Sequence, residues 1–192
     1  HGLSQAPDMI IQKSTNSGVI PWVVYHKDVG TGKYLSLNTS GTPSTAASVM
    51  SLVDSTSFSS NWSNTAYEFI NYCFHSVDGH QRVGSYLGTG VAGKIVYTDS
   101  NGDGTGTGAF RPRFVMWKAA IRPSGGGSWY IYDSTRTTSN PQGQYLQANE
   151  PAQELDGTSV FSMDFNSNGF TINATNNEIN QSGSTYIYLA IA

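Results

Sequence analysis

Short runs of aromatic and β-branched residues, separated by turn residues, recur along the whole chain. Runs of this length and composition are typical of β-strands. Helical periodicity is confined to one weak candidate at residues 46–53, which is rich in small side chains, so the sequence predicts an all-β protein. The expected strands lie at residues 9–13, 22–25, 34–37, 69–74, 95–97, 114–118, 129–132, 160–165, 170–172 and 186–191.

Two of these runs, 22–25 and 129–132, are apolar at every position. A strand without a polar face is typical of a central strand that is covered on both sides. We therefore expect a core that contains Trp22, Trp129, Phe74 and Phe114.

Four blocks of the sequence occur twice, in the same order. Residues 7–13, 22–25, 32–38 and 69–74 resemble 112–118, 129–132, 143–149 and 186–191, respectively. The offset between matching blocks grows along the chain, which indicates strands held by packing and loops free to change length. We interpret the chain as a single β domain, 1–192, made of two tandem repeats at about 2–87 and 108–192, joined by a bridging segment at 88–107.

Many short strands at regular intervals are typical of a sandwich or a barrel. Two related halves favour two sheets packed face to face. The expected fold is an antiparallel β-sandwich of the jelly-roll or lectin-like kind.

Composition narrows the classes of partner. Charged residues make up 12% of the chain and the net charge is −3. A surface with so little positive charge cannot hold a phosphate backbone, which argues against nucleic acid as a partner. No apolar run approaches the roughly 20 residues of a membrane-spanning helix, so membrane insertion is not expected.

Several segments resemble a domain that is common in virion proteins of marine tailed phages and is described as tail-fibre or adhesin-like. The resemblance covers nearly the whole chain, and it rests on residues 1–3, 7–10, 22–26, 33–38, 72–79, 84–86 and 110–112. The loops depart from that pattern, most clearly in an Asp-rich loop ahead of Phe110, so a specificity carried by loops does not transfer.

The resemblance implies a non-enzymatic structural or adhesive module of a virion, made in the bacterial cytoplasm and located on the extracellular particle. Its expected partners are copies of itself, other virion proteins and host-surface carbohydrate. A capsid decoration or fibre-shaft protein with no ligand is the alternative within the virion.

Aromatic faces beside hydroxyl and amide groups can hold sugars without charge. The candidate glycan contacts are Tyr130, Tyr132, Trp62 and Tyr86, although packing in a core or between subunits is the simpler interpretation of each.

The loop at 99–105 has oxygen-bearing side chains at alternating positions, namely Asp99, Asn101, Asp103 and Thr105. Alternating oxygens with a glycine at the sixth place are typical of a small Ca²⁺ loop. The twelfth position is Phe110, where such a loop has a bidentate glutamate. The sequence therefore predicts no cofactor, with Ca²⁺ at this loop as the alternative, and a polar hairpin tip is the simpler interpretation.

The His-Gly start suggests a different class of protein. Copper-dependent polysaccharide monooxygenases of bacterial type also begin with His-Gly, and they bind copper through the terminal amine, the first histidine and a second histidine. His1 would be the first ligand here, and His26, His75 and His80 are the candidates for the second.

Other catalytic arrangements are weak. Glu150, Glu154 and Asp156 could supply an acid and base for glycoside cleavage, but only geometry decides that chemistry. No Gly-x-Ser-x-Gly elbow accompanies the serines, so we do not expect an enzyme.

Overall fold

The computed structural model describes residues 1–62 and 66–192, and it is built almost entirely from antiparallel strands. The strands of the first half are β1 (Met9–Ser14), β2 (Val23–His26), β3 (Lys33–Ser36), β4 (Ser44–Thr45), β5 (Val49–Val53), β6 (Phe58–Ser60) and β7 (Phe69–Phe74). The remaining elements are β8 (Gln81–Leu87), β9 (Lys94–Tyr97), β10 (Phe114–Ile121), β11 (Trp129–Asp133), β12 (Gln144–Gln147), β13 (Leu155–Asp156), β14 (Met163–Asn166), β15 (Gly169–Ile172), α1 (Asn177–Asn180) and β16 (Thr185–Ile191).

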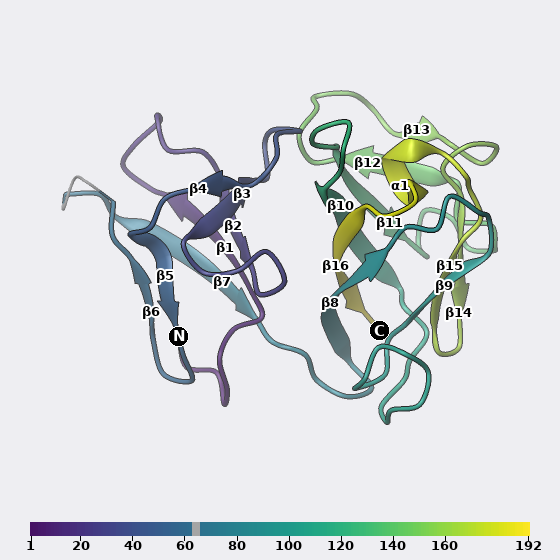
Figure 1. The fold of residues 1–192 in the computed structure, drawn as a ribbon, viewed down its shortest axis with the longest axis horizontal. Helices are drawn as coiled ribbons and strands as arrows, with labels where there is room; N and C mark the ends of the chain where they lie inside the picture. The colour runs from purple at the N-terminus through teal and green to yellow at the C-terminus, as the bar shows by residue number, and fades with distance from the viewer. Residues whose placement is uncertain (63–65) are drawn as a thin grey trace.

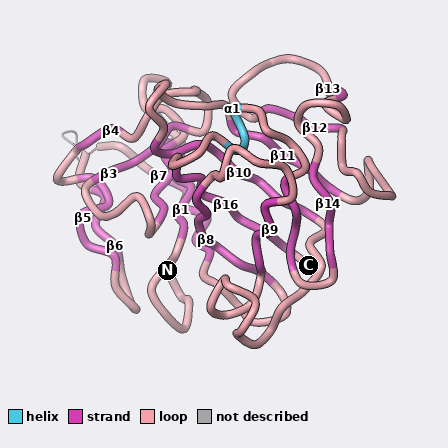
Figure 2. The backbone as a smooth tube through the Cα atoms, turned by 45° about the vertical axis from the view of Figure 1, so that its right-hand side comes forward, coloured by secondary structure: helices cyan, strands magenta, loops and turns pink. Residues whose placement is uncertain are grey.

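The strands form a sandwich with an additional layer on each outer side (Figure 1). The first sheet has the order β4-β3-β2-β1-β7 and the second has the order β13-β12-β11-β10-β16-β8. The hairpin β5-β6 covers the outer face of the first sheet, and β14-β15-β9 covers the outer face of the second. Figure 2 shows these strands in magenta, joined by long loops, with the one short helix of the described residues. The predicted all-β antiparallel sandwich is confirmed.

Each interface between layers has its own hydrophobic core. The core between the two sheets contains buried side chains from both halves, among them Met9, Val24, Leu35, Met116, Trp129, Ile187 and Leu189. A second core lies between the second sheet and β14-β15-β9, and a third lies under β5-β6. Strands β2 and β11 therefore have apolar layers on both sides, as their uniformly apolar sequences predict.

The two large sheets share their strand order and register. In the first sheet Met9 of β1 lies opposite His26 of β2, and in the second Phe114 of β10 lies opposite Asp133 of β11. The offsets that match the sequence blocks also relate the pairs β1-β7, β2-β3 and β3-β4 to β10-β16, β11-β12 and β12-β13. In each half the last strand returns to lie beside the first, as in a Greek key.

Matching lysines make matching hydrogen bonds. Lys13 Nζ on β1 donates to the carbonyl oxygen of Ile20 at 2.5 Å. Lys118 Nζ on β10 donates to the carbonyl oxygen of Gly127, which stands at the matching position. Both bonds tie a strand to the loop that leads into the next strand.

Three details differ from the sequence predictions. Strand β8 extends the second sheet through β16, although the sequence repeats predict that its residues belong to the first half. Strand β9, within the bridging segment, pairs with β15. The weak helix at 46–53 is wrong, because Val49 and Val53 pair with β6 as part of a strand. Trp22 is 36% exposed because it precedes β2 at the end of the sheet, whereas Trp129 is buried.

Helix α1 has four residues and begins after Asn176, whose side chain accepts a hydrogen bond from the Glu178 N–H. In the described part of the chain, no helix is long and apolar enough to cross a membrane.

Candidate functional site

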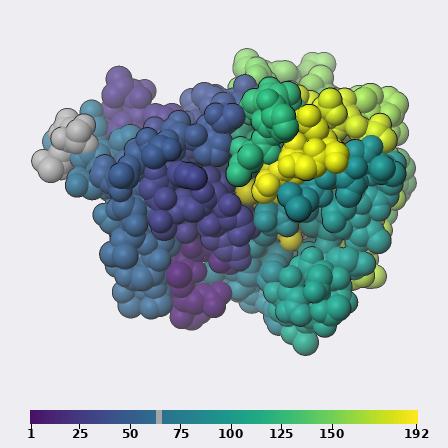
Figure 3. Space-filling model, in the orientation of Figure 1, coloured from purple at the N-terminus to yellow at the C-terminus, as the bar shows by residue number. Residues whose placement is uncertain are grey.

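A polar pocket of about 240 Å³ lies between the two halves. We call it the interhalf pocket. Four segments form its wall: the turn after β2, the middle of β8, the loop at 99–105 and strand β16, which contributes Tyr188. Its lining residues are Lys27, Asp28, Arg82, Val83, Gly84, Ser85, Asn101, Gly102 and Tyr188. Figure 3 shows the two halves in contact, with the 99–105 loop (teal) at the lower edge of the molecule.

The turn after β2 is held by a buried histidine. The Asp28 N–H donates to His26 Nδ1 at 3.2 Å, and the Asp28 carboxylate lies 3.9 Å from the same nitrogen. Burial lowers the pKa of His26 to about 4, although the charge of Asp28 acts in the opposite direction. The His26 ring is therefore neutral at neutral pH and has a structural role in this turn.

Lys27 on the same turn is fixed by an ion pair. Its Nζ lies 3.2 Å from Asp8 Oδ1, and Asp8 Oδ2 accepts hydrogen bonds from the Ser76 N–H and Oγ at 2.7 and 2.8 Å. Burial acts to raise the pKa of Asp8, but the Ser76 hydrogen bonds and the Lys27 charge outweigh it, so the pKa lies below its usual value. The Lys27 ammonium therefore has a set position at the rim of the pocket.

The wall from β8 depends on a glycine beneath a tyrosine. A Cβ at Gly84 would lie 2.8 Å from the Tyr188 hydroxyl oxygen on β16, so no larger residue fits there. The Tyr188 hydroxyl donates to the carbonyl oxygen of Tyr97 at 3.1 Å. Burial raises the pKa of Tyr188 to about 12, so the hydroxyl keeps its proton at neutral pH.

Arg82 provides the most distinctive group of the pocket. Its Nε is buried and has no hydrogen-bond acceptor among the described residues. A buried guanidinium donor without an acceptor is costly. The Arg82 side chain also lines the pocket, where a guanidinium suits carboxylate or hydroxyl oxygens. Together with the Ser85 hydroxyl and the Asn101 amide, Arg82 gives the pocket donors suited to hydroxyl or carboxylate oxygens.

The 99–105 loop closes through its own hydrogen bonds. Asp99 Oδ2 accepts from the N–H groups of Gly104 and Gly106 at 3.1 and 2.5 Å. Asp103 Oδ1 accepts from the Thr105 N–H and hydroxyl at 2.9 and 2.6 Å. The Asn101 amide donates to Thr105 Oγ1.

These bonds use Asp99 Oδ2 and Asp103 Oδ1, whereas the buried Asp99 Oδ1 has no hydrogen-bond partner among the described residues. Those residues contain no group of three or more His, Cys, Asp or Glu side chains suited to a metal. The loop forms one wall of the pocket, to which it contributes Asn101 and Gly102.

Three of the four predicted glycan contacts are buried. Tyr130, Tyr132 and Tyr86 belong to the core beneath β14-β15-β9. The Tyr132 hydroxyl donates to the Phe161 carbonyl oxygen and the Tyr86 hydroxyl donates to the Ile179 carbonyl oxygen. These rings cannot contact a ligand, so their prediction as glycan contacts is wrong and their role is packing.

Trp62 is half-buried on the outer face of the first sheet. Its indole N–H donates to Gln12 Oε1 at 2.9 Å, and its ring stacks on Phe69 with centroids 6.3 Å apart. Trp62 therefore packs against the third core and is not part of the lining of the interhalf pocket.

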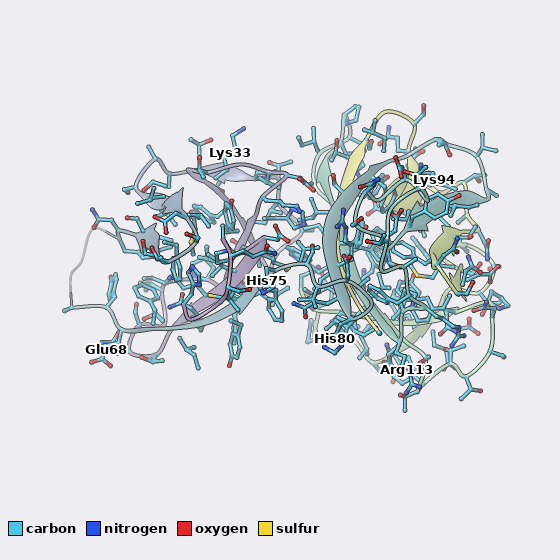
Figure 4. The ribbon with its side chains drawn as sticks, turned by 90° about the horizontal axis from the view of Figure 1, so that it is seen from below. Lys33, Glu68, His75, His80, Lys94 and Arg113 are labelled. Atoms are coloured by element: carbon cyan, nitrogen blue, oxygen red, sulfur yellow. The ribbon has the colours of Figure 1, made fainter. Side chains whose placement is uncertain are left out.

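Most of the candidate copper ligands have other partners or are buried. His1 Nδ1 accepts from the Leu3 N–H at 3.1 Å, and His1 Nε2 lies 3.1 Å from the Asp54 carbonyl oxygen. His26 is buried, while His75 follows β7 and His80 precedes β8 (Figure 4). The arrangement gives no support to a copper site.

The acidic residues near position 150 also have other partners. Glu154 Oε1 accepts from Arg136 Nη1 at 2.6 Å, and Asp156 Oδ1 accepts from the Thr158 N–H and hydroxyl. Glu150 accepts from the Asn149 amide at 3.0 Å. Glu154 thus links its segment to the loop after β11, whereas Glu150 and Asp156 make local bonds.

The sequence did not point to the lining of the interhalf pocket beyond Asn101. Lys27 comes from the turn after β2, whereas Arg82 and Ser85 come from β8, and none of them belongs to a motif. The one sequence feature that could have indicated the pocket was the Lys27-Asp28 pair at the end of an apolar strand. Charged pairs of this kind are common in turns and do not by themselves indicate a site.

Comparison with protein families gives one result. The profile of a domain of unknown function (DUF7483) matches residues 1–192. Comparison with curated proteins and with solved structures gives no match. The function must therefore be argued from the geometry of the chain itself.

Proposed function

The chain belongs to the DUF7483 family, a domain of unknown function, and we propose that it is a structural and adhesive module of a virion. It would form part of a tail fibre or similar appendage, assemble with copies of itself and hold host-surface carbohydrate in the interhalf pocket. The virion location comes from the sequence resemblance, and the pocket supplies the candidate binding site.

The Arg82 guanidinium in the pocket lining, beside Lys27, Ser85 and Asn101, is the observation that carries the binding proposal. Sugars offer many hydroxyl oxygens, and acidic sugars add a carboxylate that an arginine binds well. The pocket places the Lys27 ammonium and the Asp28 carboxylate beside neutral donors, so it can bind both acceptor and donor groups of one sugar ring.

The surroundings of the pocket support recognition without catalysis. Tyr188 keeps its proton, and Lys27 is paired with Asp8, so neither is poised as a base. Asp28 is the one carboxylate in the lining, whereas hydrolysis of a glycosidic bond ordinarily requires a pair.

A glycan array probed with the intact protein tests this proposal. We expect binding to a restricted set of glycans, enriched in acidic sugars, and at least tenfold weaker binding by Arg82→Gln. Lys94→Gln is the matched control, because Lys94 lies on β9 away from the pocket. Equal binding by the wild type and Arg82→Gln would contradict the pocket, and a folded protein that binds no glycan would favour a decoration or shaft role.

A further inference from the structure

The free edge of β7 is unusual among the described strands. Within residues 1–62 and 66–192, β7 ends the first sheet and has β1 as its single neighbour. Its sequence, FINYCF, contains no charged residue, no proline and no glycine. An exposed, neutral strand edge of this length is a ready template for pairing with another chain.

The other sheet edges carry the protection that β7 lacks. Strand β8 contains Arg82, β9 contains Lys94 and β14 contains Asp164. Strands β4, β6 and β13 have two or three residues each. Strand β5 has an irregular register, and its Met50 carbonyl oxygen accepts a hydrogen bond from the Gly32 N–H. Charges, bulges and shortness all discourage pairing between edges.

The second half shows what covers the matching edge. β16 has the position and register of β7, and β8 pairs along its whole length. Ile187 and Leu189 of β16 are buried at 0% and 3% exposure. The matching residues of β7, Ile70 and Tyr72, are 44% and 46% exposed. The first sheet therefore lacks one strand that the second sheet has.

The backbone groups at this free edge belong to Phe69, Asn71 and Cys73. The Thr15 N–H donates to the Glu68 carbonyl oxygen across the β1-β7 pair at 2.9 Å. Along an antiparallel strand, residues alternate between bonding one neighbour and bonding the other. The backbone N–H and C=O groups of Glu68 and of the even-numbered residues of β7 therefore bond to β1. Those of the odd-numbered residues are directed to the free edge.

We propose that a second copy of this chain pairs antiparallel along β7, with a twofold axis at Asn71. Asn71 would then lie opposite Asn71 of the other copy, and Phe69 would lie opposite Cys73. Three hydrogen-bonded pairs give about six backbone hydrogen bonds. The two five-stranded sheets become one continuous sheet.

The side chains favour a second copy as the occupant. The twofold axis is perpendicular to the sheet, so each side chain keeps its face, and exposed Ile70 lies opposite Tyr72 of the other copy. No charge is desolvated in β7 on pairing. This inference rests on the self-assembly in the proposed function and is independent of the carbohydrate pocket.

Disulfide trapping tests the register. Cys73 is the single cysteine of the chain, so Cys73→Ser provides a cysteine-free background. At a hydrogen-bonded pair the Cα atoms lie about 5.5 Å apart, which a disulfide can span. Asn71→Cys in this background should therefore form a disulfide-linked dimer under mild oxidation.

Tyr72→Cys in the same background is the control for register. The two copies of residue 72 lie diagonally, about 7–8 Å apart, which is too far for a disulfide. We expect at least tenfold less dimer from this variant, and equal trapping of the two variants would overturn the proposed register.

Sedimentation equilibrium tests the interface without cysteines. We expect wild-type protein to dimerise, and Ile70→Lys with Tyr72→Lys to weaken dimerisation at least tenfold, because the new lysines lie opposite one another. Ile95→Lys is the matched control, since Ile95 is 42% exposed on β9, and it should dimerise normally. Oligomers that persist unchanged in the double variant would overturn this interface alone, whereas a strictly monomeric wild type would also overturn self-assembly.

Discussion

The indole N–H of Trp129 donates a 2.8 Å hydrogen bond to the backbone carbonyl oxygen of Ser36, across the core between the two halves. Trp22, at the matching position of the first half, shares the backbone environment but not this contact. The backbone N–H of Trp22 donates to Asn38 Oδ1, and the backbone N–H of Trp129 donates to Asn149 Oδ1, again at matching positions. The two halves therefore keep the same strand geometry and differ where they meet.

This pair of tryptophans gives a matched test of the interface between the sheets. Trp129→Phe removes the hydrogen bond to Ser36 and leaves a small cavity, so it should lower the free energy of unfolding by about 1–3 kcal/mol. Trp22→Phe, at a partly exposed site, should change it by less than about 0.5 kcal/mol. Urea unfolding of both variants measures the difference, and equal losses would contradict the buried role of Trp129.

Acid should destabilise the protein through His26. The folded-state pKa is about 4 and the ordinary value is 6.5, so the unfolded state binds a proton more readily between these values. The stability due to neutral His26 is present above pH 6.5 and is lost as the pH falls toward 4. We expect a loss of about 2 kcal/mol between pH 7.5 and pH 5.

Urea unfolding at the two pH values measures this loss. His26→Asn keeps a side-chain acceptor for the Asp28 N–H but does not titrate in this range. It should show a clearly smaller loss than the wild type. The same loss in both proteins would assign the acid sensitivity to other groups.

The 99–105 loop should be stable without a metal. Asp99→Ala leaves the N–H groups of Gly104 and Gly106 without their acceptor, which should lower the free energy of unfolding by about 2–3 kcal/mol. Adding Ca²⁺ or a chelator should leave the melting temperature of the wild type unchanged. A rise of several degrees with Ca²⁺, lost in Asp103→Ala, would show instead that the loop binds the ion.

The repeated sequence blocks predicted much of the strand pairing. They matched β1, β2, β3 and β7 to β10, β11, β12 and β16, which are the strands that pair in the same register. The sequence does not predict strand β8, because Arg82, Gly84 and Ser85 interrupt its apolar pattern. Gly84 is required by the close approach of Tyr188, which only the three-dimensional structure shows.

The site was far less predictable. A run that is apolar at every position does not indicate which face is exposed to solvent. The sequence therefore allows Tyr130 and Tyr132 to be surface residues, although both are buried. The interhalf pocket combines a turn, two strands and a loop from different parts of the chain, and no spacing along the sequence links Lys27 to Arg82.

Chemical-shift mapping by NMR tests the central claim most directly. A glycan selected on the array is added to isotopically labelled protein, and the backbone amide signals are followed. The account predicts saturable shifts centred on Lys27, Arg82 and Asn101, with none at Tyr130. Shifts centred on another surface, or an absence of saturable shifts with every glycan tested, would contradict a carbohydrate site between the two halves.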